Sequence, residues 1–218
     1  MQKALNSFLE ELKQNPNNLA VALFGSHAKG TNRPDSDIDL LVITKNINQR
    51  GVEKKHGQEF EIVYATAPDT EAFYKKDPNN YVRFWQHAII LYDPQKILAK
   101  FQKKAHAMFK EKKHPMSEDA IKHSIFNLTD QLHYINFQID KDPANALRML
   151  YSHLYTTLDF YFDYHQIWKP APKETLQTLD KINPRLAQKA RELLLETSIN
   201  KKGTIFEELI RELGINEL

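Results

Sequence analysis

The chain has 218 residues, 41% of them hydrophobic, which is enough for a packed core and for two domains of modest size. The 30 basic and 28 acidic side chains nearly cancel, so no overall positive field favours a nucleic-acid partner, and the absence of cysteine excludes disulfides and thiolate metal sites. No apolar run reaches membrane-spanning length, and acids interrupt the apolar positions of the first helix, unlike a secretion signal; we expect a cytoplasmic protein with no membrane partner.

The first predicted elements are a helix and two buried strands. Residues 1–14 carry apolar side chains at helical spacing, and residues 19–24 form a short apolar run that predicts a buried strand. Gly25 ends this run and, having no Cβ, allows a tight turn and close approach of a ligand to the backbone. A second β-branched and apolar run over residues 38–44 predicts the next buried strand.

Two aspartates stand at the beginning of this second strand. Because residues two apart on a strand point to the same side, Asp37 and Asp39 are expected to project together. Two such carboxylates repel each other unless a cation lies between them, and Mg²⁺ prefers oxygen ligands of this kind. A solvated turn is the alternative, since Asp and Ser are common in turns. The flanking strands and the preceding Gly-Ser turn favour a metal site.

The spacing of these residues resembles a known signature. Gly25-Ser26, ten further residues and Asp37-Ile38-Asp39 are similar to the signature of the DNA polymerase β-like nucleotidyltransferase superfamily. Residues 26–30 and 36–40 resemble its small bacterial members, the kanamycin- and streptomycin-type antibiotic nucleotidyltransferases and the minimal nucleotidyltransferases. The resemblance extends over about the first 65 residues and is architectural beyond them.

The resemblance implies a third carboxylate on a later strand. Residues 58–65 predict that strand, and the order Phe60-Glu61-Ile62-Val63 fits the expected pattern of an acid among apolar residues, although the family more often has Asp. Glu61 is therefore our choice for the third acid. Glu59 lies on the same face by the period of two and stays open as an alternative.

The resemblance also implies roles, cofactors and partners. Asp37 and Asp39 would bind two Mg²⁺ ions, and Glu61 would bind the catalytic ion and assist deprotonation of the attacking hydroxyl. ATP would be the nucleotide donor, and five residues are expected to bind it: Gly25, Ser26, Lys29, Arg33 and Ser36.

The remaining elements of the first half predict further helices and a last strand. Helices are expected from residue 68 and over residues 81–87, followed by an apolar strand before Asp93-Pro94 and a lysine-rich helix over residues 95–113. Together with the resemblance, these elements predict an α+β fold. Its first part is a nucleotidyltransferase-type mixed β-sheet with flanking helices, a catalytic domain over residues 1–113.

The second half is predicted to be entirely helical. An apolar stripe with alternating spacings of four and three follows an N-cap at Ser117. Four more helices are expected, the last beginning at a capping box that starts at Thr204 and ending at Gly214. The other three are predicted over residues 143–165, 173–181 and 184–197. Residues 114–218 would then form a helical bundle domain for acceptor binding or dimerisation.

The aromatic helix over residues 143–165 also carries candidate acceptor ligands. Asp159 and Asp163, one turn apart, are candidates for contact with a cationic or polyhydroxyl acceptor. The expected acceptor is a small molecule such as an aminoglycoside-like antibiotic. The alternatives are a protein or tRNA modified in a toxin–antitoxin type system, and a non-catalytic nucleotide-binding module. Near-neutral charge disfavours nucleic acid, tRNA included, although tRNA stays open as the one nucleic-acid alternative. A homodimer is a further expectation from the resemblance.

The same helix contains an Arg-x4-His sequence. Arg148 and His153 are similar to the motif of HEPN ribonucleases, a helical family. Five residues on a helix correspond to about 140° of rotation, so the two side chains are not expected on one face. The sequence therefore favours a chance occurrence over a nuclease site.

Overall fold

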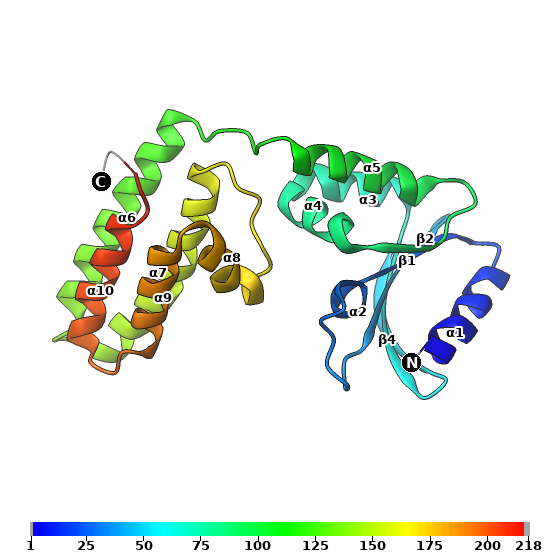
Figure 1. Ribbon diagram of the computed structural model, residues 1–218, viewed down its shortest axis with the longest axis horizontal. Helices are drawn as coiled ribbons and strands as arrows, with labels where there is room; N and C mark the ends of the chain where they lie inside the picture. Colours follow the sequence, from blue (N-terminus) through cyan, green and yellow to red (C-terminus); the bar gives the residue numbers. More distant parts are fainter. Residues whose placement is uncertain (1, 216–218) are drawn as a thin grey trace. The chain divides into compact units, whose positions relative to one another are not determined.

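The computed structural model describes residues 2–215, which divide into two compact units between residues 111 and 112 (Figure 1). The first unit contains a β-sheet with flanking helices, and the second contains only helices. Within residues 2–215, none of the helices has both the length and the apolar character needed to cross a membrane. The predicted α+β fold class, a mixed sheet with flanking helices followed by a helical region, is confirmed.

The first unit is built on a sheet of five strands in the order β3-β4-β2-β1-β5. Strand β4 runs parallel to β2, and the other neighbouring pairs are antiparallel. The strands are β1 (Asn18–Phe24), β2 (Ile38–Thr44), β3 (Gln49–Lys55), β4 (Gln58–Ala65) and β5 (Ile89–Tyr92). Strand β3 was not predicted, because an exposed edge strand needs no alternation of apolar residues and its sequence has none.

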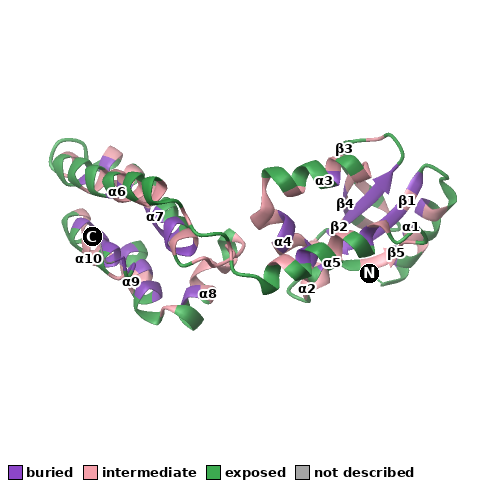
Figure 2. Cartoon of the chain, turned by 90° about the horizontal axis from the view of Figure 1, so that it is seen from above, coloured by how far each residue is buried: buried purple, intermediate pink, exposed green. Residues whose placement is uncertain are grey.

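Helices cover both faces of this sheet (Figure 1). Side chains of one face, such as Leu40 and Val42, pack against α1 (Gln2–Gln14). The opposite face, which includes Leu41 and Ile43, packs against the later helices. Those helices are α3 (Ala67–Lys76), α4 (Pro78–His87) and α5 (Ile97–Lys110). Buried residues accordingly concentrate on the central strands β1, β2 and β4 (Figure 2). The short helix α2 (Gly25–Lys29) connects β1 to the loop before β2.

The second unit consists of five α-helices and one 3₁₀ turn in residues 112–215. The helices are α6 (Glu118–Gln138), α7 (Pro143–Tyr164), α8 (Thr175–Ile182), α9 (Pro184–Leu195) and α10 (Ile199–Arg211), with η1 (Pro172–Glu174) before α8. Three side chains cap helix N-termini by accepting a backbone N–H: Ser117, Asp142 and Asn183. Phe160, Tyr161 and Phe162 of α7 are buried in the core of this unit.

The predicted start of the last helix is wrong. Helix α10 begins at Ile199, so Thr204 lies inside the helix and does not cap it. The misleading signal is the capping-box pattern from Thr204 to Glu207, which lies inside the helix, and Gly203 just before it serves packing. A Cβ at Gly203 would lie 2.8 Å from Oδ1 of Asn136, so the glycine permits close approach of α10 to α6.

Candidate functional site

Three carboxylates meet at the beginning of the parallel strand pair β2 and β4. One oxygen of each of Asp37, Asp39 and Glu61 lies within 4.8 Å of the others. The register explains the contact, because Asp39 and Glu61 are direct partners on the two neighbouring strands. Asp37 stands just before β2. Glu59, the alternative third acid, is exposed and lies outside the cluster.

The turn after β1 packs directly against this cluster. Gly25 has a φ of +69°, in the left-handed region, and a Cβ at this position would lie 1.8 Å from Oδ2 of Asp39. Any other residue would therefore displace the carboxylate or the turn, besides being strained by its backbone conformation. The glycine is required because the backbone and the aspartate share the same space.

The carboxylates perturb one another. Burial raises the pKa of Asp39 to about 6, and the negative charges of Asp37 and Glu61 and a side-chain hydrogen bond with Glu61 add to the increase. Arg50 acts in the opposite direction and also forms a salt bridge with Glu61, whose side chain is 21% exposed. Sequence reasoning missed Arg50 because it lies on the unpredicted edge strand β3. The sequence indicated this residue only as a basic side chain eleven positions before Glu61.

The donor set fits a divalent cation such as Mg²⁺. Hard cations take carboxylate oxygens as ligands, and three carboxylates this close retain unfavourable repulsion in the absence of a cation. Burial is the main cause of the raised pKa of Asp39, and that repulsion adds to it. A bound cation would favour the ionised form of all three groups.

The other predicted nucleotide-binding residues lie in or beside α2 and its following loop. Ser26 and Lys29 belong to α2 and are half-buried. Arg33 forms an exposed ion pair with Asp35, at 3.1 Å. Its backbone N–H donates to the hydroxyl of Ser36 at 2.9 Å, which orders the loop just before the acids. These side chains therefore share one loop region, with Arg33 facing solvent.

The family model for the nucleotidyltransferase domain matches residues 5–126, more than half of the chain. The chain belongs to this family. It contains a nucleotidyltransferase domain, and the predicted membership of the polymerase β-like superfamily is confirmed.

Individual relatives agree with this assignment. A curated protein of Methanocaldococcus jannaschii, named "Putative protein adenylyltransferase", is 39% identical over 56 residues, which span 25% of this chain and 38% of the relative. A nucleotidyltransferase-like protein from Exiguobacterium sibiricum has a similar fold. Its TM-score is 0.56 at 13% sequence identity, and the match covers 98% of this chain and 74% of the other. A toxin–antitoxin structure with AMP-PNP aligns with a TM-score of 0.32, too low to establish a shared fold.

The candidate acceptor ligands of the helical unit are paired with lysines. The ammonium group of Lys169 lies 3.2 Å from Asp159 and 2.9 Å from Asp163, and Lys113 also forms a salt bridge with Asp163. The two aspartates thus belong to one charge network that joins α7 to the segments before α6 and after α7. Their negative charge is compensated within the nucleotidyltransferase itself.

The Arg-x4-His pair does not form a joint site. Arg148 donates hydrogen bonds to Asn145 on its own helix. His153 lines a small cavity of about 210 Å³ between α6 and α7. Burial lowers the pKa of His153, and the positive charge of Arg148 lowers it further. The histidine is therefore held in its neutral form.

Proposed function

We propose that this nucleotidyltransferase transfers AMP from ATP to a hydroxyl group of an acceptor, with two Mg²⁺ ions. The observation that carries the proposal is the cluster of Asp37, Asp39 and Glu61, against which the Gly25 turn is packed. Nucleotidyl transfer needs charge neutralisation and alignment more than covalent help from the protein, and a carboxylate cluster beside a phosphate-accessible turn provides both.

The three acids would hold the metal. Asp37 and Asp39 offer ligands from one strand start, and Glu61 offers a third from the neighbouring strand. When bound, Mg²⁺ supplies neutralisation of the triphosphate charge and of the charge that develops in the transition state. The backbone at Gly25 and the Ser26 hydroxyl would contact the terminal phosphates.

Further positive charge would come from α2 and its loop. Lys29 and Arg33 would add charge near the phosphates, and Ser36 would hold the loop between them and the acids. The ion pair of Arg33 with Asp35 is exposed, so little free energy is lost when a phosphate replaces the carboxylate.

The reaction exchanges a phosphoanhydride bond of ATP for a phosphoester bond to the acceptor. The acceptor oxygen attacks the α-phosphorus, a new O–P bond forms, and the bond from the α-phosphorus to the bridging oxygen of the β-phosphate breaks. Pyrophosphate leaves with that electron pair. The hydroxyl proton passes to the carboxylate of Glu61, which lies in the cluster with 21% of its side chain exposed.

In this proposal, residues 1–113 are the catalytic domain, and residues 114–218 bind the acceptor or form a homodimer in the cytoplasm. A small hydroxyl-bearing molecule is the first acceptor class, by resemblance to the antibiotic enzymes. A protein hydroxyl is the second, favoured by the name of the Methanocaldococcus relative. The lysine partners of Asp159 and Asp163 argue against these two acids as ligands of a cationic antibiotic.

Transfer of labelled AMP tests the proposal and separates the acceptor classes. The full chain is incubated with ATP labelled at the α-phosphate, Mg²⁺, and separately with aminoglycosides, lincosamides, tRNA or cell lysate. We expect Mg²⁺-dependent label in one fraction and none with the Asp39→Asn variant. Label that is absent from every fraction, or retained in the variant, would contradict the proposal.

A further inference from the structure

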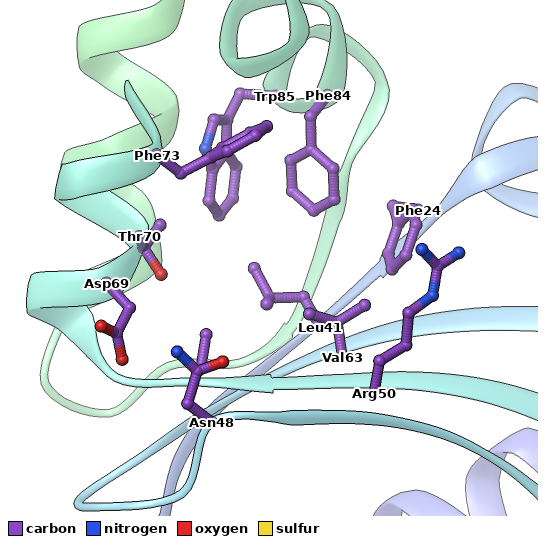
Figure 3. A pocket seen from close by; sticks show the side chains of 11 residues that line it. Phe24, Leu41, Asn48, Arg50, Val63, Asp69, Thr70, Phe73, Phe84 and Trp85 are labelled. Carbon is purple, nitrogen blue, oxygen red and sulfur yellow. The ribbon is translucent and has the colours of Figure 1, made fainter. Parts of the chain in front are cut away.

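A cavity of about 440 Å³ lies next to the acids, on the same face of the sheet. Leu41 and Val63 form its base, and Phe73, Phe84 and Trp85 lie above them on α3 and α4 (Figure 3). The volume is within the range of about 300–1,000 Å³ that is typical of small-molecule sites. The lining is mostly apolar, and aromatic rings contribute much of it.

The distance from the acids is set by the strands. Leu41 follows Asp39 by two positions, and Val63 follows Glu61 by two, so all four side chains lie on one face. Two positions along a strand correspond to about 7 Å. The cavity therefore begins one row of side chains beyond the carboxylates, about the span of a ribose from a phosphate held at the acids.

The chemistry of the lining favours a flat aromatic group. Phe73 lines the cavity and is 44% exposed to solvent although it is a large apolar residue. Stacking of a nucleobase on such a ring contributes about 1–3 kcal/mol. A base covering this ring would remove apolar surface from water without any rearrangement of the core.

The polar groups of the lining indicate how a base edge would be recognised. Asp69 accepts a hydrogen bond from the Thr66 hydroxyl at 2.6 Å, and the Thr70 hydroxyl donates to the Thr66 carbonyl, so both side chains are occupied by the start of α3. Arg50 is paired with Glu61. Asn48 also lines the cavity, and its side chain makes no hydrogen bond within residues 2–215. An Asn amide matches the N6 and N7 edge of adenine by donating one hydrogen bond and accepting another.

We infer that this cavity binds the base of the nucleoside triphosphate, and that Asn48 gives it a preference for adenine. The inference rests on the proposed function, because it needs the α-phosphate at the acids. The inference adds recognition of the base. The Gly25 turn and the acids cannot supply it, since they would contact only the phosphates and the metal ions.

Equilibrium binding to the full chain tests the inference. The probes are α,β-methylene ATP, α,β-methylene CTP and inorganic tripolyphosphate, each with Mg²⁺. Phe73→Ala is expected to weaken α,β-methylene ATP binding about tenfold, from the loss of one stacked ring, with tripolyphosphate binding unchanged. Asn48→Ala is expected to reduce the preference for the adenine over the cytosine analogue. Phe109→Ala, which removes an aromatic ring of 50% exposure outside the cavity, is the matched control.

The outcomes separate this inference from the proposed function. If both cavity variants bind α,β-methylene ATP like the wild type, the cavity does not hold the base, and the inference fails while nucleotide binding stands. If the cavity variants bind nucleotide normally but show a higher KM for the acceptor that receives labelled AMP, the cavity holds the acceptor and the inference again fails. Loss of Mg²⁺-dependent binding of every probe in the wild type would overturn the inference and the proposed function together.

Discussion

Replacement of Asp39 by Asn should stabilise the metal-free protein while abolishing transfer. The pKa of Asp39 rises from its ordinary value of 3.8 to about 6 on folding, chiefly through burial and then through Asp37 and Glu61. A pKa shift of one unit corresponds to 1.36 kcal/mol, so the ionised carboxylate lowers the free energy of unfolding by up to about 3 kcal/mol above pH 6. Because the side chain is partly exposed, we expect a loss of about 1–3 kcal/mol. Asn has nearly the same shape without the charge.

The pH dependence follows from the sign of the shift. The folded state holds the Asp39 proton more tightly than the unfolded state, so this group's stabilising contribution is complete below pH 3.8. It is lost as the pH rises to about 6 and changes little above that. The wild-type free energy of unfolding should therefore fall over this interval relative to that of the Asn variant. Urea denaturation at a series of pH values between 4 and 8, followed by circular dichroism, measures the difference.

Mg²⁺ should reverse the difference. Binding to the folded state raises the free energy of unfolding by an amount that grows with ligand concentration, and we expect this increase at pH 7.5 in the wild type only. An Asp39→Asn variant that is less stable than the wild type at pH 7.5 without Mg²⁺ would refute the electrostatic argument. A variant that retains Mg²⁺-dependent stabilisation would refute the metal assignment.

Three further predictions concern the same cluster. Glu61→Gln should lower the transfer rate at least a hundredfold and Glu59→Gln less than twofold, measured with labelled ATP, because only Glu61 lies among the acids; equal rates would contradict this. Gly57→Ala should cost about 1–3 kcal/mol in urea denaturation, because its backbone has positive φ. Gly25→Ala should cost more than that, because the same strain is joined by overlap of the new Cβ with Asp39. Only Gly25→Ala should abolish Mg²⁺ binding, since a Cβ at Gly57 meets open space. Arg50→Gln should tighten Mg²⁺ binding several-fold in calorimetry by removing a competing cation, and unchanged or weaker binding would exclude that competition.

The order of strands and helices could be predicted because it depends on local patterns. Apolar runs in the sequence predicted strands β1 and β2. Four helices of the second unit begin within two residues of their predicted starts. The exposed edge strand β3 could not be found in this way, because exposed positions impose no apolar period and its pairing with β4 depends on the hairpin turn at His56-Gly57. The start of α10 was misplaced because the capping-box pattern at Thr204 lies inside a helix that packs against α6 at Gly203, and local rules do not show that packing.

Sequence alone determined the family, since the Gly-Ser turn and the paired aspartates are neighbours along the chain and their spacing matches its signature. Tertiary structure decided which glutamate joins them. Residues 59 and 61 have the same parity, and only the register of β4 against β2 places Glu61 opposite Asp39. The opposing cation Arg50 and the aromatic cavity likewise arise from strands and helices that are distant in sequence and meet only on folding. A local sequence pattern can specify a turn, whereas a contact between side chains of two strands forms only when the strands pair in the sheet.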